Sequence, residues 1–313
     1  RLDTGTGRIS LSDGTEIATD AVVVATGGRP RTLPGRGDLD GVHTLRTIED
    51  ASALRAELTE GASRVVVVGA GWIGAEVAST CHGLGLPVTI VEAMRAPLAA
   101  VLGADMAAVC TALHADHGVA LRSGIGVRGF TSVSHHGRRR VTGVELADGT
   151  TIPADVVVVG VGMRPVTEWL TGSGIDVDNG VLCDAGCVTS VPRVVAVGDV
   201  ARYRNHDGTL VRHEHWTNAA EQPATAIRNL LAGATIERYR PSEYVWSDQY
   251  GVRLQFAGNT RDADGIKVLD GSPDDRKFVA AYHRGGETIG VMAMNSAKLF
   301  TRVRRQLATP AVS

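Results

Sequence analysis

Residues 64–93 read RVVVVGAGWIGAEVASTCHGLGLPVTIVEA, and this stretch decides the fold of the chain. Four valines predict a buried strand, the glycines a tight loop, the next residues an apolar-periodic helix, and VTIV a second strand. We expect Gly69 to make the turn out of the strand, Gly71 to let the backbone approach a pyrophosphate, and Gly74 to let the helix pack closely on the strand. The free N–H groups of the helix N-terminus would then point at the phosphates. The stretch therefore predicts a βαβ unit that binds a dinucleotide.

An acidic residue ends the second strand of this unit. Glu92 follows Gly74 by eighteen residues, the position where a carboxylate accepts hydrogen bonds from the ribose hydroxyls. Because a carboxylate there would repel a 2′-phosphate, we expect NADH to be preferred to NADPH, although Arg95 works against that preference. A strand-to-helix turn that binds no ligand is the alternative.

Strand and helix patterns fill the rest of the chain. Alternating residues around an SDG turn predict a small β-meander at the start, and AVVVAT predicts a buried strand after it. A Pro- and Gly-rich linker, 27–41, precedes a helix capped by Thr47 or Asp50. Further predicted elements are a helix at 104–118, a strand at 119–124, a hairpin at 126–150, a strand at 155–162 that closes the sheet, a strand at 193–199, a helix at 219–233, several strands after 244 and a helix at 296–308.

The composition is that of an ordinary soluble protein. The chain has 313 residues, 43% of them hydrophobic, and a formal net charge of −2, so its charge does not indicate nucleic-acid binding. The apolar runs are interrupted well short of the roughly 20 residues that a membrane span needs, and we expect a cytoplasmic protein with no membrane partner. No metal site is predicted: Cys183 and Cys187 are a redox pair or ordinary thiols, and His213 and His215 are metal ligands or ordinary loop histidines.

Further motifs extend the dinucleotide pattern. They are ATGGRP (25–30), GVGMRP (160–165), TSVPRVVAVGD (189–199) and WSDQ (246–249). With GAGWIGAE (69–76), they make the chain resemble the FAD-dependent ferredoxin and rubredoxin reductases of oxygenase systems, a branch of the pyridine nucleotide-disulfide oxidoreductases. The resemblance covers essentially the whole chain. It implies an α/β fold class with two Rossmann-like dinucleotide-binding domains and a small α+β C-terminal interface domain.

The resemblance implies which residues contact FAD. Asp199, after Gly198 at a strand end, would accept hydrogen bonds from the ribityl chain, and Val195 stands where the family usually has an aromatic residue. Trp246 of WSDQ is either a wall of the flavin site or a buried packing residue. Other cofactor-binding residues implied by the family motifs are Thr26, Gly27, Arg31 and Gly162.

Two residues are implied at the site of hydride transfer. Trp216 precedes a helix that we expect to begin at Thr217 or Asn218, a position in which similar reductases lay an aromatic ring against the flavin. Glu76, just past the glycine loop, corresponds to a family glutamate near the nicotinamide. A solvated helix glutamate is the alternative for Glu76.

The same resemblance predicts the domain organisation. We expect a remnant of the FAD-binding domain at 1–41, the NAD-binding Rossmann domain at 42–163, a second FAD-domain segment at 164–238 and the interface domain at 239–313. The family's first GxGxxG loop would lie upstream of residue 1. We therefore expect an N-terminally truncated chain, lacking roughly 80 to 100 residues of an incomplete FAD domain.

The predicted function is that of a flavoprotein oxidoreductase. A hydride would pass from NADH to FAD, and single electrons would then pass to a ferredoxin with a 2Fe-2S cluster or to a rubredoxin. Lys298, Arg302 and Arg305 form a basic stripe on the last helix that either docks an acidic ferredoxin or is an ordinary solvated face. Three alternatives stay open: a reductase of another acceptor, a flavin-free NADH-binding module without turnover, and a structural or signalling protein of the apoptosis-inducing-factor kind.

Overall fold

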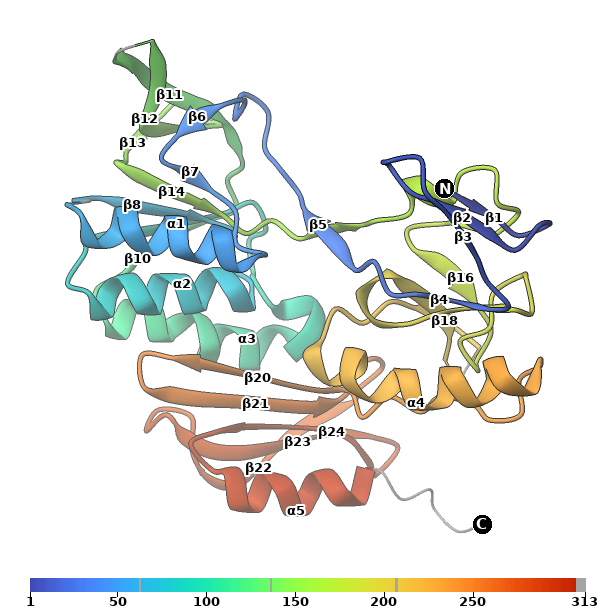
Figure 1. The fold of residues 1–313 in the computed structure, drawn as a ribbon. Helices are drawn as coiled ribbons and strands as arrows, with labels where there is room; N and C mark the ends of the chain where they lie inside the picture. Colours follow the sequence, from blue (N-terminus) through green and yellow to red (C-terminus); the bar gives the residue numbers. More distant parts are fainter. Residues whose placement is uncertain (62, 136, 206–207, 308–313) are drawn as a thin grey trace. The chain divides into compact units, whose positions relative to one another are not determined.

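The computed structural model describes residues 1–61, 63–135, 137–205 and 208–307. These residues form two compact units, and each unit combines two stretches that are far apart in sequence. The first unit contains 1–29 and 163–245, and the second contains 30–162 and 246–313. Figure 1 shows the elements of both units.

A five-stranded parallel sheet is the centre of the second unit. Its strand order is β10-β9-β8-β14-β7. The strands are β7 (Val42–His43), β8 (Val65–Val68), β9 (Val88–Glu92), β10 (Ala120–Ser123) and β14 (Val156–Val159). The predicted βαβ unit is confirmed, with α2 (Trp72–Gly83) between β8 and β9. The prediction that 155–162 closes the sheet is wrong, because β7, which directly follows the predicted linker, pairs outside β14 and forms the edge.

Both faces of this sheet are buried, which explains the unbroken valines of β8. Val65 and Val67 face α2 and α1 (Ile48–Thr59). They share one buried core with Val77 of α2 and Leu54 of α1. Val66 and Val68 face the other way and pack with the hairpin strand β12 (Arg138–Leu146) in a second core. A strand buried on both sides has no polar face, so it loses the usual alternation.

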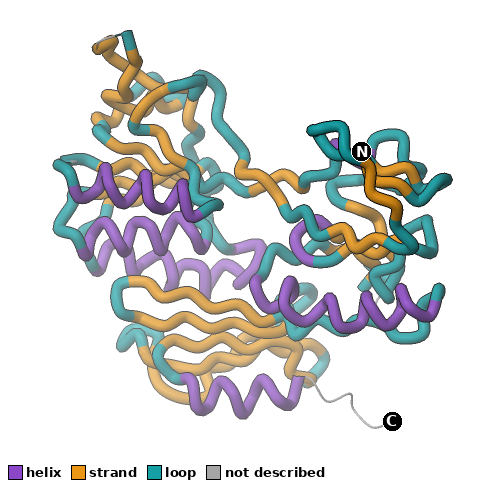
Figure 2. Tube along the Cα trace, in the orientation of Figure 1, coloured by secondary structure: helices purple, strands orange, loops and turns teal. Residues whose placement is uncertain are grey.

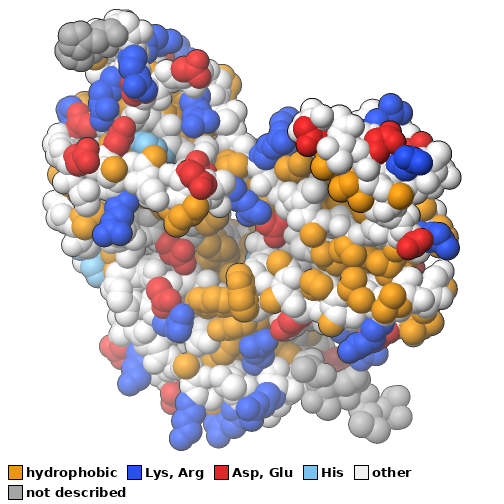
Figure 3. Space-filling view, in the orientation of Figure 1, with side chains coloured by type: hydrophobic (Ala, Val, Ile, Leu, Met, Phe, Trp, Pro, Cys, Tyr) orange, Lys and Arg blue, Asp and Glu red, His pale blue; other side chains and the backbone are white. Residues whose placement is uncertain are grey.

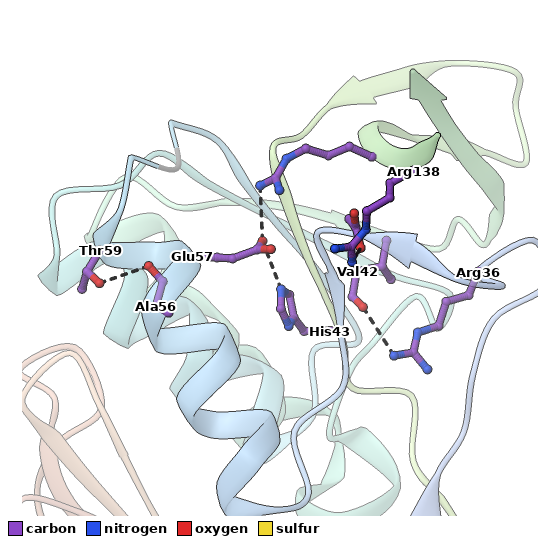
Figure 4. A network of polar contacts seen from close by, with 9 residues as sticks. Arg36, Val42, His43, Ala56, Glu57, Thr59 and Arg138 are labelled. Carbon is purple, nitrogen blue, oxygen red and sulfur yellow. Dashed lines mark hydrogen bonds and ion pairs between the residues drawn. The ribbon is translucent and has the colours of Figure 1, made fainter. Parts of the chain in front are cut away.

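The predicted hairpin is confirmed by β11 (Val127–His135) and β12, which pair antiparallel; residue 136 lies outside the described residues. β12 also pairs with β13 (Thr151–Pro153) and, in parallel, with β6 (Leu39–Asp40). The Pro- and Gly-rich linker is thus partly ordered into short strands. Polar contacts hold it there: Arg138 pairs with Asp40 at 2.6 Å, and Glu57 of α1 lies 3.1 Å from the Nε2 of His43 (Figure 4).

Helix α1 begins where the sequence places a cap. Thr47, rather than Asp50, is the N-cap residue. The Asp50 N–H donates to the Thr47 hydroxyl at 3.2 Å, while the Asp50 carboxylate accepts from the Thr47 N–H at 3.1 Å. Such a capping box satisfies two otherwise unpaired donors and stabilises a helix start by about 1 kcal/mol.

The C-terminal part of the second unit is an antiparallel sheet with one helix on it. The five strands have the order β20-β21-β24-β23-β22. They are β20 (Tyr244–Gln249), β21 (Val252–Gly258), β22 (Gly265–Ser272), β23 (Lys277–Arg284) and β24 (Glu287–Met294), followed by α5 (Ala297–Leu307). Phe300 and Val303 are the buried residues of α5. The predicted helix also included Ala308, which lies outside the described residues.

Helix α3 (Ala99–Asp116) connects this C-terminal sheet to the parallel sheet. The Tyr282 hydroxyl donates to the Leu102 carbonyl at 2.7 Å, and Arg276 pairs with Asp116 at 2.8 Å. Within the described residues, α3 is the one helix long and apolar enough to cross a membrane. Its backbone is non-helical at Gly103, and one face of it, with Leu102, Met106 and Leu113, is buried in protein.

The first unit is built from small sheets and one long helix (Figure 2). The predicted meander is confirmed: β1 (Leu2–Asp3), β2 (Arg8–Ser10) and β3 (Glu16–Ala18) are antiparallel neighbours. β4 (Val22–Val24) pairs in parallel with β17 (Val194–Ala196). The remaining elements are β16 (Val181–Cys183), β18 (Ala201–Arg204), β19 (Leu210–Val211), the 3-10 turns η1 (Glu168–Leu170) and η2 (Gly198–Val200), and α4 (Trp216–Ala232).

A two-stranded ribbon lies at two of the three points where the chain changes unit. β5 (Gly28–Pro30) pairs with β15 (Met163–Pro165), and these strands carry the echoing motifs ATGGRP and GVGMRP. These two unit boundaries fall at 29/30 and 162/163, and the third falls at 245/246 within β20. The similarity of the motifs therefore corresponds to a physical pairing, and the α/β fold class is confirmed.

Candidate functional site

The glycines after β8 have the three geometries that a dinucleotide loop needs. Gly69 has φ +105°, and a Cβ there would lie 2.3 Å from the Gly160 carbonyl oxygen at the end of β14. A Cβ on Gly74 would lie 1.9 Å from the Gly69 carbonyl oxygen, so the first turn of α2 packs directly on the loop. A Cβ on Gly71 would meet nothing within 4 Å.

The open space at Gly71 is where a pyrophosphate fits. Gly71 is the N-cap of α2 and supplies no side-chain hydrogen bond to the helix end. The first N–H groups of α2 and the positive end of its dipole therefore remain suited to an anion. The loop fits NAD: the protein's own packing requires Gly69 and Gly74, and the space beside Gly71 is open.

Glu92 is held against the same loop. One carboxylate oxygen accepts from the Ala70 N–H at 2.8 Å and the other from the Met94 N–H at 2.8 Å. These bonds place a half-buried carboxylate at the carboxyl end of β9, where a ribose would lie. Arg95 is exposed, and its Cγ lies 3.2 Å from where a Cβ of Gly124 would be.

Glu76 is not a solvated helix glutamate. It lies on α2, two residues after Gly74, and its Oε1 accepts from the Ser247 hydroxyl at 2.7 Å. Ser247 in turn accepts from the Gln249 amide at 3.0 Å. Ser247 and Gln249 are 0% and 1% exposed. The WSDQ motif of β20 thus reaches the helix that opens at the glycine loop.

Gly162 and Arg31 lie together in the second unit, at the end of the β5/β15 ribbon. The Arg31 N–H donates to the Gly162 carbonyl at 2.9 Å, and Gly162 has φ +89°. In the first unit, the Thr26 hydroxyl donates to the Val166 carbonyl at 2.7 Å, and the Val166 N–H donates to the Gly27 carbonyl at 2.9 Å. The two motifs thus pair through their backbones and the Thr26 hydroxyl, and the Thr26 and Arg31 side chains are exposed.

Gly198 and Asp199 form a turn at the carboxyl end of β17. Gly198 has φ +70°, and its N–H donates to the Gln222 Oε1 at 2.7 Å. Gln222 is fully buried on α4, and its Nε2 has no hydrogen-bond partner among the described residues. Arg212 donates to the Asp199 carbonyl at 3.2 Å. The chain therefore fixes the backbone of this turn, and Asp199 is half-buried at a strand end where a flavin hydroxyl fits.

Trp216 is the first residue of α4, one or two residues earlier than predicted, with His215 as N-cap. Its side chain is 72% exposed, although a large aromatic residue is usually buried. The next residue, Thr217, donates to the Tyr244 carbonyl at 2.7 Å and anchors the helix start. An exposed indole beside a helix N-terminus fits the face of a flavin ring.

The histidines before α4 belong to a polar cluster. The Tyr203 hydroxyl lies 2.8 Å from the Nδ1 of His213, and the rings of His213 and His215 stack at 5.9 Å. Burial, together with the charge of His215, lowers the pKa of His213 to about 4. Among the described residues, no group of three or more His, Cys, Asp or Glu side chains could hold a metal ion.

Cys183, Cys187 and Trp246 lie in buried or half-buried positions. Cys183 and Cys187 are buried in the core of the first unit, and burial raises the pKa of the Cys187 thiol to about 12. An attacking thiolate is therefore disfavoured there. Trp246 is half-buried on β20, next to Ser247.

The structure gathers the predicted residues into two groups. The second unit holds Gly69, Gly71, Gly74, Glu76, Glu92, Arg31, Gly162 and Trp246, and the first holds Thr26, Gly27, Gly198, Asp199 and Trp216. Sequence reasoning missed Ser247, Gln249 and Gln222. The period of two in WSDQ was the available signal for Ser247 and Gln249, because alternate strand residues share a face.

Comparison with known proteins supports a dinucleotide-binding oxidoreductase. Residues 1–223 match the family described as pyridine nucleotide-disulphide oxidoreductase, and residues 244–312 match the reductase C-terminal family. The chain is 37% identical over 311 residues to rhodocoxin reductase of Rhodococcus erythropolis, an alignment that covers 99% of this chain and 71% of that protein. It is 35% identical over 303 residues to putidaredoxin reductase of Pseudomonas putida, with 95% and 70% covered.

The fold agrees with a solved structure as well. The chain superposes with a TM-score of 0.89 and 33% identity on the crystal structure of a covalent putidaredoxin reductase–putidaredoxin complex, covering 98% of this chain and 73% of that one. The βαβ unit with its glycine loop, the Gly198–Asp199 turn and the C-terminal sheet all fall within these matches. This chain belongs to the pyridine nucleotide-disulphide oxidoreductase family.

Proposed function

We propose that this protein transfers a hydride from NADH to FAD and then passes electrons one at a time to a ferredoxin or rubredoxin. The observation that carries the proposal is the presence of two nucleotide-type strand ends, Gly69–Gly74 after β8 and Gly198–Asp199 after β17. Relatives named as reductases of rhodocoxin and putidaredoxin support the acceptor class.

The residues have separate tasks in this reaction. Bound FAD supplies the ring that accepts a hydride and releases electrons singly. Gly71 and the start of α2 bind the NADH pyrophosphate, and Glu92 accepts from the ribose. Asp199 holds the flavin chain, and Trp216 provides an apolar wall that excludes water. No side chain needs to act as acid or base in hydride transfer, so positioning is the protein's contribution.

The last helix is the proposed docking face for the acceptor. Lys298, Arg302 and Arg305 are exposed on α5, and with Lys277 and Asp270 they line an open hollow of about 800 Å³. Figure 3 shows Lys and Arg side chains gathered over α5. A positive patch of this kind attracts an acidic iron–sulfur protein and speeds its encounter. We place the protein in the cytoplasm.

A second candidate function is NADH binding without flavin turnover. It is favoured by one observation: the glycine loop, Glu92 and Glu76 all lie in the second compact unit. NADH binding would then need no residue of the first unit.

Reduction of cytochrome c tests the choice of acceptor. Protein supplied with FAD and NADH should reduce cytochrome c rapidly only when a 2Fe-2S ferredoxin is added. Equal rates with and without ferredoxin would indicate a reductase of another acceptor. A lack of reduction by any acceptor, with NADH still bound, would support the second candidate function.

A further inference from the structure

The WSDQ strand divides its side chains between two faces. Ser247 and Gln249 point into the second unit, whereas Asp248 is exposed and pairs with Arg253 at 2.8 Å. This alternation is what a strand imposes. The two inward polar groups therefore need partners inside the protein, and they find them in each other and in Glu76.

The direction of the hydrogen bonds follows from the chemistry of each group. Gln249 Nε2 can only donate, so the Ser247 oxygen accepts from it at 3.0 Å. The single hydroxyl hydrogen of Ser247 is then left for a carboxylate oxygen, Glu76 Oε1, at 2.7 Å. Such a chain of donors is polarised towards the carboxylate, and the low dielectric around buried groups strengthens it.

The hydrogen bond from Ser247 holds the Glu76 carboxylate in place by one of its two oxygens, Oε1. Among the described residues, Ser247 is the side chain that donates to it, and Oε2 remains an acceptor. Glu76 lies two residues beyond Gly74 on the helix whose N-terminus faces the pyrophosphate. Its carboxylate is therefore on the helix expected to bind the nucleotide, in the second turn, beyond the N-terminal residues that would face the pyrophosphate.

We propose that Ser247 and Gln249 are positioning residues that fix the Glu76 carboxylate so that its second oxygen accepts a hydrogen bond from the nicotinamide half of NADH. This inference rests on the proposed function, because it requires NADH on the glycine loop. It assigns WSDQ a role through α2, beside the flavin wall expected for Trp246. The C-terminal domain would then contribute to nicotinamide recognition through Glu76.

A second hydrogen bond between α2 and β20 provides a matched control for a purely structural role of Ser247. The Tyr250 N–H, just after β20, donates to the Ser79 hydroxyl of α2 at 2.7 Å. Ser79 lies one turn beyond Glu76, and its bond joins α2 to the end of β20 without touching the carboxylate. Ser79→Ala therefore removes a connection between helix and strand but leaves the relay from Gln249 intact.

The experiment compares two ligands by calorimetry under anaerobic conditions. NADH is titrated into protein supplied with FAD and reduced by dithionite, so that no hydride is transferred, and ADP-ribose serves as a ligand that lacks nicotinamide. Ser247→Ala and Glu76→Ala should each weaken NADH binding about tenfold, with ADP-ribose binding unchanged. The double variant should bind NADH no more weakly than Glu76→Ala alone. Gln249→Met should reproduce part of the loss, and Ser79→Ala should change neither affinity.

The outcomes distinguish failure of this inference from failure of the proposed function. If Ser247→Ala weakens NADH and ADP-ribose equally, or if its effect adds fully to that of Glu76→Ala, the relay is only structural and the inference is overturned while the proposed function stands. If the variant does not fold, the same comparison with Gln249→Met decides. If the wild-type protein binds neither ligand, both the inference and the proposed function fail.

Discussion

At the scale of single residues, the glycine loop shows why one residue type recurs for different reasons. Gly69 and Gly74 are required by the protein's own packing, because a Cβ there would lie 2.3 and 1.9 Å from carbonyl oxygens, whereas Gly71 borders open space. All three were predicted from sequence, because the loop is local and its spacing is enough to assign each task. Substitution can therefore separate folding from binding.

Gly74→Ala should destabilise the protein, and Gly71→Ala should not. The alanine Cβ at 74 would overlap a backbone oxygen, and relieving that overlap should lower the free energy of unfolding by about 1 to 3 kcal/mol. The alanine at 71 meets no protein atom within 4 Å, so unfolding should be unchanged while NADH binds at least about tenfold more weakly. Denaturant unfolding and NADH titration measure the two effects. Gly83→Ala, also in open space on α2, is the control, and equal losses of NADH affinity at 71 and 83 would contradict the assignment.

Glu92 should determine the choice between NADH and NADPH. Replacing it by Gln removes the negative charge and keeps an acceptor oxygen for one of the Ala70 and Met94 N–H groups, while the other N–H faces the amide NH2. We expect NADH to bind about threefold to tenfold more weakly and NADPH to bind more tightly, since the repulsion of its 2′-phosphate is lost. The ratio of kcat/KM for the two nucleotides measures this. An unchanged ratio would show that Glu92 does not contact the ribose.

At the scale of elements, a histidine on α3 makes packing against the C-terminal sheet depend on pH. His114 is buried, its Nδ1 lies 2.8 Å from the Tyr250 hydroxyl, and the His117 ring stacks on Tyr250 at 4.4 Å. Burial, and secondarily the charge of His117, lowers the pKa of His114 to about 4. In the unfolded chain the pKa is about 6.5.

The free energy of unfolding should therefore fall as the pH drops from about 6.5 towards 4, because only the unfolded chain then takes up the proton. The slope from one such group is about 1.4 kcal/mol per pH unit. His114→Gln should remove that part of the slope, leaving the part due to His213, whose pKa is also lowered to about 4. Denaturant unfolding at pH 5 and 7 measures it. Tyr250→Phe should lower stability at both pH values without changing the slope, and an unchanged slope in His114→Gln would refute the assignment.

Helix α5 should govern docking of the acceptor without affecting the flavin. Arg302→Glu reverses one exposed charge of its basic stripe, and we expect the KM for ferredoxin to rise about fivefold to tenfold at low salt, less at high salt. Reduction of ferricyanide by NADH should be unchanged. Arg139→Glu makes the same charge change on β12. If both variants raise the KM equally, net charge rather than the α5 surface is responsible.

The elements also show where sequence reasoning stops. The parallel strands, the hairpin and the capped helix were predictable, since their signals are periodic or local. The edge position of β7 was not predictable, because it depends on the pairing of Val42 with Val157, which are far apart in sequence. The relay from Gln249 to Glu76 likewise joins residues that are distant in sequence, so WSDQ indicated the family but not the contact.

At the scale of the whole molecule, each compact unit carries one nucleotide-type strand end and draws on two separated stretches of sequence. The four-part domain division from sequence remains a prediction, as do the individual cofactor contacts. Family membership establishes the kind of enzyme, and the proposed electron path requires FAD at Asp199 and Trp216 together with NADH at the glycine loop.

The most direct test of this account is a visible absorption spectrum of the 313-residue chain, incubated with FAD, passed through gel filtration and then treated with NADH without oxygen. The account predicts retained flavin absorbance that bleaches on addition of NADH, since both nucleotide sites would then be present and in communication. A colourless protein that still binds NADH would contradict hydride transfer by this chain and leave NADH binding as its activity.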